Sequence, residues 1–297
     1  MKILITGSSG MLGRALCEAL AGKNEVVGID VAEPTGGIRP DIFYNADATD
    51  SSALSEIFER ENPEVVIHAA AMTDVDGCET DPEKAMRLNA ISTEKVAVAC
   101  LDRDASLVYI STDFVFDGKK GSPYTEEDAT GPLSVYGRSK LEGEEAVKRM
   151  LTRYAIVRTS WLFGPGGRNF VDAIVDKAEE GEHLEVVDDQ IGSPTYTKDL
   201  AQAIKRFIVT DGAFASEVFN ISNSGRCSWY EFAAAAVKDA GFENIAIDHI
   251  RSKDLDRPAK RPPFSVLDCS KFEKKTGFRM RFWREALDDY LKEKGQR

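Results

Sequence analysis

The segment GSSGMLG, residues 7–13, restricts the fold more than any other part of the sequence. It follows the apolar run 2–6, which predicts a short buried strand, and it opens the segment 11–22, whose leucines recur at helical spacing. Three glycines at this junction permit a tight turn, a close approach of the backbone to a ligand, and close packing of helix on strand. The N-terminus of such a helix directs N–H groups at an anion. The segment therefore predicts a parallel α/β unit with an anion-binding turn.

Strands and helices continue to alternate after this turn. Further buried strands are predicted over 25–30, 64–70, 105–112 and 154–160. Amphipathic segments between and after them predict helices over 50–63, 81–104, 134–149 and 169–180. This alternation is typical of a parallel sheet that helices cover on both faces. We therefore predict an α/β fold with a Rossmann-type, doubly wound parallel sheet.

The character of the sequence changes after about residue 162. Glycine and proline become frequent, and short elements joined by loops are predicted in the segments FGPGGRNF, DDQIGSPTYT and RPAKRPPFS. The apolar run 216–222 predicts one more core strand. We expect two interleaved parts: a dinucleotide-binding domain, and a smaller C-terminal substrate domain. The first comprises 1–161 plus about 196–222, and the second comprises about 162–195 plus 223–297.

Charge and composition exclude several classes of partner. The 297 residues carry a net charge of −12, whereas nucleic acids and anionic membranes require basic surfaces. No apolar run approaches the roughly 18 residues of a membrane span, and MKILITG is too short for a signal peptide. Five scattered cysteines without a CxxC pair, and three histidines without ligand spacing, predict a reduced, cytoplasmic protein with no metal site. Any anionic ligand then needs local Arg or Lys side chains, or helix N-termini.

The glycine turn and the second strand predict the cofactor. Gly7 allows the tight turn, Gly10 lets the backbone approach a diphosphate, and Gly13 lets the helix pack against the strand. Asp30 ends the second strand, 17 residues after Gly13, where a carboxylate accepts hydrogen bonds from an adenosine ribose. The next residues, 31–33, supply no cation for a 2′-phosphate. NADH is therefore expected to be preferred, with NADPH as the second choice.

Residues after the neighbouring strands extend this prediction. Asp47 either reaches the adenine through an acceptor oxygen or caps the following turn, and both interpretations stay open. The small residues Ala69–Ala71 stand at the carboxyl end of the strand 64–70. They either let the backbone come close to the cofactor or serve compact packing. His68, in the same strand, is expected to be a hydrogen-bonded core histidine rather than a catalyst.

The stretch SVYGRSK places Tyr136 four residues before Lys140, so both side chains share one helical face that points into the crevice at the strand ends. The adjacent ammonium is expected to lower the pKa of Tyr136 from its ordinary value near 10. Thr112, with Ser111 and Asp113 beside it, ends the strand 105–112 and supplies a hydroxyl near the phenol. The arrangement predicts proton donation by Tyr136 to a carbonyl oxygen while hydride reaches the carbonyl carbon, with Lys140 on the nicotinamide ribose.

These residues resemble the pattern of the extended short-chain dehydrogenase/reductase family: Gly7, Gly10, Gly13, Thr112, Tyr136 and Lys140. Within that family the chain resembles the RmlD-type dTDP-4-dehydrorhamnose reductases, through the segments GSSGMLG, AAAMTDVDGCE, RLNA, STDFVFDG, VYGRSKLEGE, RTSWLFG and DDQIGSPTYTKDLA. The segments span residues 1 to about 200, and the region beyond about 225 matches loosely. The resemblance implies NAD(P)H-dependent reduction of the 4-keto group of a dTDP-6-deoxyhexulose to dTDP-L-rhamnose, in nucleotide-sugar and polysaccharide biosynthesis.

The resemblance also implies roles for individual residues. Cofactor contacts are implied for Gly10, Met11, Leu12, Asp30, Asp47, Ala48, Ala69, Ala70 and Ala71. Catalysis is implied for Thr112, Tyr136 and Lys140. Sugar contacts are implied for Thr112, Asp113 and Trp161, and contacts to the nucleotide diphosphate for Asn169, Gln190 and Arg261. Some family members bind magnesium at a dimer interface through glutamates, one of them in the first helix. Ala15 stands at that place here, so we expect no such metal site and leave a homodimer open.

Two alternative functions stay open beside the reductase. One is another NDP-sugar oxidoreductase, such as a 4-epimerase or a 4,6-dehydratase. A dehydratase adds an acid/base pair beside the threonine, commonly Asp–Glu, whereas Asp113 and Phe114 follow Thr112 here. The other is a non-catalytic regulatory subunit like the beta subunit of methionine adenosyltransferase, which resembles this family. For an enzyme the expected partner is a small-molecule nucleotide-sugar substrate, with no nucleic acid and no membrane, whereas a regulatory subunit would co-purify with a synthetase.

Overall fold

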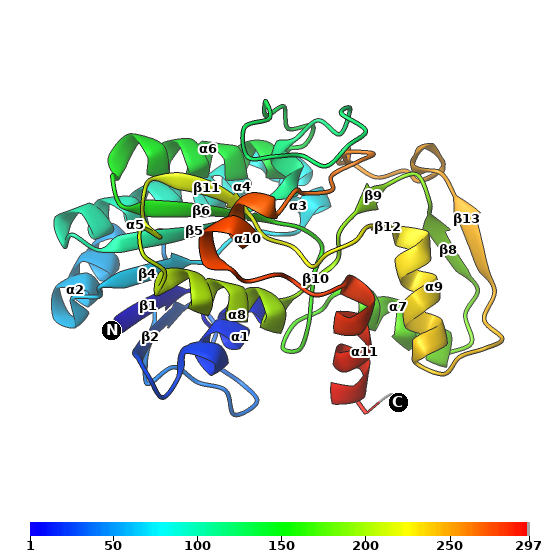
Figure 1. Ribbon diagram of the computed structural model, residues 1–297, viewed down its shortest axis with the longest axis horizontal. Coiled ribbons are helices and arrows are strands. Elements are labelled where there is room, and N and C mark those ends of the chain that lie inside the picture. Colours follow the sequence, from blue (N-terminus) through cyan, green and yellow to red (C-terminus); the bar gives the residue numbers. More distant parts are fainter. Residues whose placement is uncertain (296–297) are drawn as a thin grey trace.

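A computed structural model describes residues 1–295, and one parallel sheet forms its centre (Figure 1). The seven strands of this sheet are β1 (Lys2–Thr6), β2 (Glu25–Asp30), β3 (Ile42–Asn45), β4 (Val65–His68), β5 (Ser106–Thr112), β6 (Tyr154–Thr159) and β11 (Glu217–Asn220). They lie in the order β11-β6-β5-β4-β1-β2-β3, and every neighbouring pair is parallel. The predicted α/β fold with a Rossmann-type sheet is confirmed.

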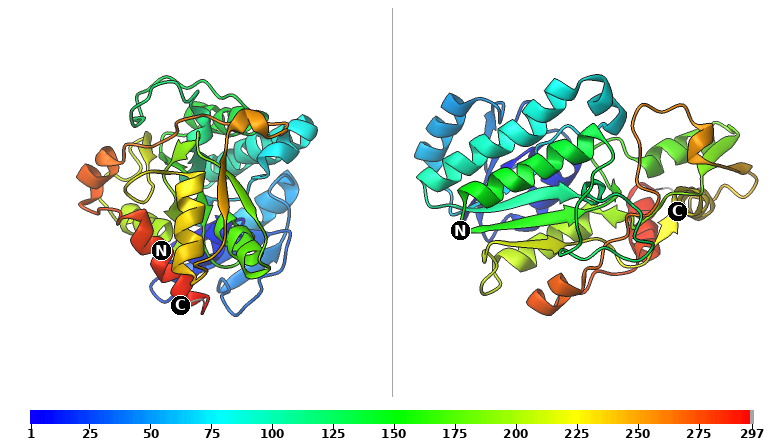
Figure 2. Two further views of the ribbon diagram at one scale, coloured as in Figure 1. Left: turned by 90° about the vertical axis from the view of Figure 1, so that its right-hand side faces the viewer. Right: turned by 90° about the horizontal axis from the view of Figure 1, so that it is seen from above.

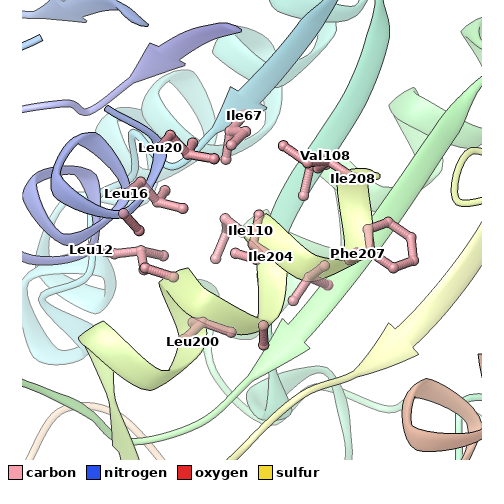
Figure 3. Close-up of a cluster of buried hydrophobic side chains, with 14 of the residues drawn as sticks. Leu12, Leu16, Leu20, Ile67, Val108, Ile110, Leu200, Ile204, Phe207 and Ile208 are labelled. Atoms are coloured by element: carbon pink, nitrogen blue, oxygen red, sulfur yellow. The ribbon is translucent and has the colours of Figure 1, made fainter. Parts of the chain in front are cut away.

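Helices cover both faces of the sheet (Figures 1 and 2). One face carries α1 (Met11–Leu20) and α8 (Thr197–Ile208), and the other carries α2 (Ser51–Glu61), α5 (Ser92–Asp102) and α6 (Val135–Met150). Side chains alternate along each strand, so Ile3 and Ile5 of β1 point to the first face and Leu4 to the second. Figure 3 shows the first cluster, where Leu16 of α1 and Ile204 of α8 gather on the same face with strand residues such as Ile110. Burial of this apolar surface is the main stabilisation of the fold.

The sheet reverses its direction of growth at β1, and this reversal positions the site. Strands β2 and β3 follow on one side of β1, whereas β4, β5, β6 and β11 follow on the other. The helix after β1 covers one face, while α5, which follows β4, covers the opposite face. The two connections diverge and leave a crevice beyond the carboxyl ends of β1 and β4.

The helical segment predicted over 81–104 consists of three joined pieces. These are α4 (Pro82–Met86), a π-helical turn η1 (Arg87–Ile91) and α5, and the short helix α3 (Val75–Thr80) precedes them. Pro82 occupies the first turn of α4, as the sequence predicts, because proline lacks the N–H that this position leaves unbonded. A π-helical turn inside an α-helix is rare and often marks a functional site.

A smaller unit lies beyond the carboxyl ends of the strands, on the right of Figure 1. Its helices are α7 (Phe170–Glu179), α9 (Trp229–Asp239), α11 (Trp283–Glu293) and the 3₁₀ turn η3 (Ser252–Asp254). Its strands are β7 (Leu162–Phe163), β8 (Leu184–Val187), β9 (Ile191–Gly192), β10 (Thr195–Tyr196), β12 (Cys227–Ser228) and β13 (Ile247–Ile250). They form three two-stranded pairs, β10-β7, β12-β9 and β13-β8. Aromatic side chains dominate the core that α7, α9 and α11 share, including Phe163, Phe232, Trp283 and Tyr290.

The chain crosses between the two parts several times. The segment of α8 and β11 returns to the sheet, where β11 pairs with β6. A later helix, α10 (Ser270–Thr276), also lies against this part of the molecule. Phe272 of α10 and Met280 pack in the apolar cluster of α1 and α8. Both residues fall in the segment 223–297, which we assigned to the smaller domain, and the division into two domains stays a prediction.

All five cysteines are unpaired, and all but Cys269 are buried. Within residues 1–295 no helix is long and apolar enough to traverse a lipid bilayer. In the same part of the chain no three His, Cys, Asp or Glu side chains gather in a way that would hold a metal ion.

Candidate active site

A cleft of about 780 Å³ opens at the carboxyl ends of the parallel strands, and residues of the smaller unit complete its wall. Most of the predicted site residues line this one cleft. They are Gly7, Gly10, Met11, Leu12, Gly13, Asp30, Asp47, Ala48, Ala69, Ala70, Ala71, Thr112, Asp113, Tyr136, Lys140 and Trp161. The structure therefore brings together the glycine turn, the strand ends and the tyrosine–lysine helix, which lie far apart in the sequence.

The glycine turn has the geometry of a diphosphate cradle. Gly7 adopts a φ of +71°, and a Cβ there would lie 2.7 Å from the backbone nitrogen of Ala70. A Cβ on Gly13 would lie 2.0 Å from the carbonyl oxygen of Gly7, so only glycine lets α1 pack this closely on the turn. Gly10 caps α1, and the first turn of this helix contains no acidic side chain. The free N–H groups and the positive end of the helix dipole are thus available to an anionic ligand.

Two carboxylates are fixed beside this cradle. Asp30 accepts hydrogen bonds from the backbone N–H of Ser9 at 2.9 Å and of Ala32 at 3.0 Å. Its position at the cleft agrees with the predicted contact to an adenosine ribose, which stays a prediction. Asp47 accepts a hydrogen bond from the backbone N–H of Thr49 at 2.8 Å and also lines the cleft. Asp47 therefore caps its turn, and the contact to adenine is left as a prediction.

Asn89, on the π-helical turn, fixes the loop that follows β4. Its side chain accepts from the backbone N–H of Met72 at 2.7 Å and donates to the carbonyl of Met72 at 3.1 Å. It also donates to the hydroxyl of Ser139 on α6 at 2.9 Å. Asn89 is fully buried. It lies in the segment RLNA, but sequence reasoning assigned it no role, since only the fold shows that this segment reaches both the loop and α6.

His68 is a core residue, as we predicted. Its two ring nitrogens lie 2.6 Å from the hydroxyl of Thr6 and 3.1 Å from that of Thr93. The ring stacks on Tyr109, and burial lowers the pKa of His68 to about 3. A neutral, doubly hydrogen-bonded imidazole in this position serves packing rather than proton transfer.

A glycine and a capping serine position Tyr136. Helix α6 begins after Ser134, whose hydroxyl accepts a hydrogen bond from the backbone N–H of Gly137 at 3.1 Å. A Cβ on Gly137 would lie 2.3 Å from the carbonyl oxygen of Phe114, in the 3₁₀ turn η2 (Asp113–Val115) that follows β5. The missing side chain thus lets α6 approach the end of β5. Tyr136 comes within hydrogen-bonding reach of Thr112 and meets the ring of Phe114 edge-on.

The expected lowering of the pKa of Tyr136 is not what the structure shows. Burial raises the pKa of Tyr136 because the phenolate would lose its hydration, and the nearby hydroxyl of Thr112 offsets only part of this effect. The negative charge of Asp113 raises the pKa further. The prediction was wrong because it considered only the four-residue spacing to Lys140, whereas burial depends on how the surrounding loops close over the ring.

Burial also shifts the pKa of Lys140. Only 3% of its surface is exposed, and its ammonium lies 4.3 Å from the ring centre of Tyr109. Burial lowers the pKa of Lys140 to about 7, against a smaller opposing effect of Glu144 one helical turn away. Glu144 in turn forms a buried ion pair with Arg158, with two hydrogen bonds of 2.9 and 2.7 Å. The pair joins α6 to β6 behind the cleft.

Asp113 directly follows Thr112 and is buried beside it. The hydroxyl of Thr112 donates to Asp113 at 3.1 Å. Burial raises the pKa of Asp113 to about 7, and hydrogen bonds to the carboxylate oppose this shift. Asp113 is thus a buried residue of the cleft wall whose pKa lies near 7.

Trp161 reaches the cleft from the end of β6 in a strained backbone conformation. Its φ is +48°, which is rare for a residue with a large side chain. The indole stacks on that of Trp229 with ring centres 3.6 Å apart and planes inclined by 7°. A Cβ on Gly192 would lie 2.4 Å from the ring of Trp161, so Gly192 makes room for it. Both indoles line the cleft, yet Trp229 was missed because it lies 68 residues from Trp161 in the sequence.

The structure does not bring Asn169, Gln190 and Arg261 to the cleft wall. Asn169 caps α7, and its amide donates to Tyr290 at 3.0 Å. Gln190 donates to the hydroxyl of Ser252 at 2.8 Å. Arg261 forms a two-pronged ion pair with Asp76 of α3, at 2.8 and 3.1 Å. All three bind segments of the protein to one another, and the expectation that they contact the diphosphate finds no support in this geometry.

Three cationic side chains line the cleft that we did not predict from the sequence. Lys84 of α4 and Arg87 of the π-helical turn lie on one wall, and Arg168 lies in the loop before α7. They supply the local positive charge that an acidic protein needs for an anionic ligand. Their signal in the sequence is weak, because isolated Lys and Arg residues in surface segments are common. Only the fold places these three at the same cavity.

The fold and this arrangement define a class of protein. A glycine cradle lies at the switch point of a parallel sheet, and the partly buried Tyr136 lies on the wall of the same cleft with the buried Lys140 and Thr112. This combination is that of a nicotinamide-dependent oxidoreductase of the short-chain dehydrogenase/reductase class, in which an ordered phenol serves proton transfer.

Comparisons with known proteins narrow the class to a family. A family model described as the RmlD substrate binding domain matches residues 1–295. The chain is 40% identical over 294 residues to the spore coat polysaccharide biosynthesis protein SpsK of Bacillus subtilis, with 99% of this chain and 98% of the relative covered. The chain belongs to the RmlD family of dTDP-4-dehydrorhamnose reductases.

Two solved structures support the same assignment. A dTDP-4-dehydrorhamnose reductase from Clostridium acetobutylicum is 39% identical, with a TM-score of 0.91 and coverage of 99% of this chain and 100% of that one. The corresponding enzyme from Bacillus anthracis, solved in complex with NADP, is 34% identical, with a TM-score of 0.90 and coverage of 98% and 99%. The similarity therefore includes the smaller unit as well as the sheet.

Proposed function

We propose that this protein reduces the 4-keto group of a dTDP-6-deoxyhexulose to give dTDP-L-rhamnose, with a nicotinamide dinucleotide as the hydride source. The observation that carries the proposal is the convergence of Thr112, Tyr136 and Lys140 on the cleft that also contains the glycine cradle. Relatives of 34% to 40% identity that cover almost the whole chain include enzymes with this activity.

The residues of the cleft fit the dinucleotide. The glycine turn has no room for side chains and presents N–H groups, and Asp30 offers a carboxylate at the end of β2. We assign the diphosphate to Gly7, Gly10 and Gly13, and the adenosine ribose to Asp30. A bound nicotinamide supplies the hydride. The cofactor contacts of Met11, Leu12, Asp47, Ala48 and Ala69–Ala71 belong to the same proposal.

The protein's own groups handle the proton. Tyr136 keeps its proton at neutral pH because its pKa is raised, so it is a donor rather than a base at the start of the reduction. Thr112 orients the phenol and the carbonyl oxygen, and Tyr136 transfers its proton to that oxygen as hydride adds to the carbon. Lys140 restores charge balance near the resulting phenolate. We assign sugar contacts to Asp113 and Trp161, which lie beside Thr112 and across the cleft.

The decisive experiment is a reduction assay with dTDP-4-keto-6-deoxy-L-lyxo-hexulose. Replacing Tyr136 by Phe removes the proton donor but preserves the ring, so kcat should fall by about 100- to 10,000-fold. The dissociation constant of the reduced cofactor should change little. Tyr230→Phe is the matched control, because Tyr230 stacks on His249 in the smaller unit and does not line the cleft.

Three outcomes contradict the proposal. Equal kcat values for wild type and Tyr136→Phe would remove Tyr136 from the mechanism. The absence of turnover in wild type, with retained cofactor binding, would favour a regulatory subunit. Epimerisation without net oxidation of the cofactor would favour an NDP-sugar epimerase.

The cofactor preference is a finer part of the proposal. We infer that NADH is used better than NADPH, since Asp30 would repel a 2′-phosphate and residues 31–33 include no cation. The homologue that was solved with NADP bound favours the alternative, a preference for NADPH. The ratio of kcat/KM for the two reduced cofactors decides between them, and a clear NADPH preference would overturn the inference.

We also propose a cytoplasmic location and a homodimer as the form in solution. Five unpaired cysteines suit a reducing compartment. Exposed apolar side chains on one helical segment, among them Ile91, Val98 and Leu101, would suit a contact between copies. Sedimentation equilibrium measures the mass directly, and a monomer at micromolar concentration would contradict the dimer.

A further inference from the structure

Arg168 lies in a glycine-rich loop that the smaller unit extends to the cofactor cradle. The loop comprises Gly164 to Arg168, and Gly164 and Gly166 adopt φ values of +154° and +88°. Conformations of this kind are readily open to glycine and strained for other residues. Arg168 is exposed and lines the cleft together with the glycine turn of β1 and α1.

The loop rests directly on the N-terminal end of α1. A Cβ on Gly167 would lie 3.5 Å from the Cβ of Met11 and 4.0 Å from its backbone nitrogen. A Cβ on Gly166 would lie 2.7 Å from the Cδ of Arg14. The loop therefore approaches the first turn of α1, where the cradle presents its N–H groups.

The position of the loop is fixed from its other end. Asn169 donates to the carbonyl oxygens of Gly164 at 3.0 Å and Gly167 at 3.4 Å, while its own carbonyl caps α7. Asn169, predicted as a ligand contact, instead holds the loop that carries Arg168. Within residues 1–295, the guanidinium of Arg168 forms no hydrogen bond or ion pair with another side chain. It is thus a cation held over the cleft without a protein anion to neutralise it.

We propose that Arg168 binds the diphosphate of the nicotinamide dinucleotide from the side opposite the glycine turn. This inference rests on the proposed function, since it names a further residue of the same cofactor site. A diphosphate carries two negative charges, and a planar guanidinium matches its oxygens in a two-pronged contact. The cofactor is then held by both parts of the molecule, with the cradle below and the loop of the smaller unit above.

The nucleotide sugar also contains a diphosphate, so the test must separate the two ligands. ADP-ribose contains the diphosphate of the cofactor and dTDP contains that of the substrate, and neither undergoes reaction. Arg168→Gln should lower the affinity for ADP-ribose at least roughly tenfold, which is equivalent to about 1.4 kcal/mol. Its affinity for dTDP should stay within about twofold, and Arg168→Lys should retain part of the ADP-ribose affinity.

Lys177→Gln is the matched control. It removes one positive charge from α7, where Lys177 is more than half exposed and away from the cleft. This variant should bind both ligands as wild type does. Calorimetry gives the dissociation constants, and circular dichroism verifies that each variant keeps its unfolding midpoint.

The loop itself provides a second test. Gly166→Ala places a side chain at a φ of +88°, which strains the backbone of the loop, and the Arg14 side chain must also move. In the wild-type background this change should lower the affinity for ADP-ribose, because Arg168 moves with the loop. In the Arg168→Gln background the same change should have almost no further effect. Additive losses in the double variant would show that Gly166 acts without Arg168 and would overturn the proposal.

The remaining outcomes are equally decisive. A loss of dTDP affinity with unchanged ADP-ribose affinity would assign Arg168 to the substrate, and equal losses for both would indicate a general electrostatic effect. Either result overturns the inference while leaving the proposed reductase activity intact. If wild type bound neither ADP-ribose nor reduced cofactor, the proposed function itself would fail.

Discussion

Burial, rather than the pairing of opposite charges, controls proton affinity around the cleft. It raises the pKa of Tyr136, raises that of Asp113 to about 7 and lowers that of Lys140 to about 7. Each shift favours the neutral form, since a low-dielectric environment disfavours charge. An anionic ligand in the cleft would partly reverse the shift of Lys140. Asp113 and Lys140 can therefore change charge near neutral pH, whereas Tyr136 keeps its proton there.

Asp113→Asn should change how stability depends on pH. The folded-state pKa of Asp113, about 7, exceeds the ordinary value of 3.8, so the folded protein binds more protons than the unfolded chain between these pH values. The stability that the protonated carboxyl contributes is therefore lost as pH rises from about 4 to 7. The steepest loss is roughly 1.4 kcal/mol per pH unit. Asn does not titrate, so the free energy of unfolding of wild type, relative to the variant, should fall over this range and level off above it.

Urea unfolding at several pH values between 4 and 8 measures this difference. Subtraction of the two profiles cancels the titration of Lys140 and of the surface groups, which are common to both proteins. If the free energies of unfolding of wild type and variant changed in parallel with pH, Asp113 would have the same pKa in the folded and the unfolded chain. This result would contradict the raised pKa that we attribute to burial.

At the scale of elements, the start of α6 positions the catalytic group through local signals. Ser134 caps the helix, and Gly137 lets it approach the turn after β5. Asn89, on the π-helical turn, then ties α6 to the loop after β4. Three elements that the sequence separates are thereby brought to fixed distances around Tyr136.

Gly137→Ala should disturb this arrangement. The added Cβ would lie 2.3 Å from the carbonyl oxygen of Phe114, and backbone must move to accommodate it. We expect the free energy of unfolding to fall by about 1–3 kcal/mol. The kcat should fall at least roughly tenfold, since displacement of Tyr136 by even a fraction of an ångström misaligns the proton donor. Urea unfolding and the reduction assay measure the two effects.

Gly131→Ala is the control for this change. Its φ is ordinary for an L-residue, and the atom nearest to the added Cβ would lie 3.4 Å away, which is normal contact. Both stability and kcat should stay close to wild type. If Gly137→Ala behaved in the same way, the close approach of α6 would not be needed for catalysis.

At the scale of the whole molecule, the two parts are joined by a chain that crosses between them repeatedly. The strand β11 and the helices α8 and α10 come from the second half of the sequence, yet they complete the core beneath the sheet. The ion pair of Arg261 with Asp76 links the C-terminal segment to α3. Such interleaving predicts that the two parts unfold together rather than as separate domains.

Phe272→Ala tests this cooperativity. Phe272 is buried beneath the sheet, and its truncation should cost about 3–5 kcal/mol. All three tryptophans lie in or against the core of the smaller unit, so their fluorescence reports on that unit. The fluorescence transition in urea should shift as far as the transition in far-ultraviolet circular dichroism. A shift confined to the circular dichroism signal would indicate that the smaller unit unfolds independently.

Val209→Ala provides the matching control, because 63% of Val209 is exposed at the end of α8. It should leave both transitions within about 0.5 kcal/mol of wild type. A large effect of this exposed residue would mean that the comparison reports something other than core packing.

Some parts of the site could be predicted from the sequence because they depend on contiguous residues. The glycine turn needs only a strand, three glycines and a helix in order, and Tyr136 and Lys140 share a face through helical periodicity alone. Trp229 and Arg168 could not be found in this way, since their places at the cleft depend on how the smaller unit docks. The incorrect expectation for the pKa of Tyr136 has the same origin, because burial is a property of the whole surroundings.

The sequence alone determined the parallel sheet, the cradle for a diphosphate, and the residue types of the catalytic group, since periodicity and backbone sterics act over a few neighbouring residues. Tertiary structure decided which cations face the cleft, that Asn169, Gln190 and Arg261 serve internal contacts, and that Phe272 belongs beneath the sheet. It also decided the protonation of Tyr136, Asp113 and Lys140. These features depend on desolvation and on contacts between distant segments, which arise only when the chain has packed.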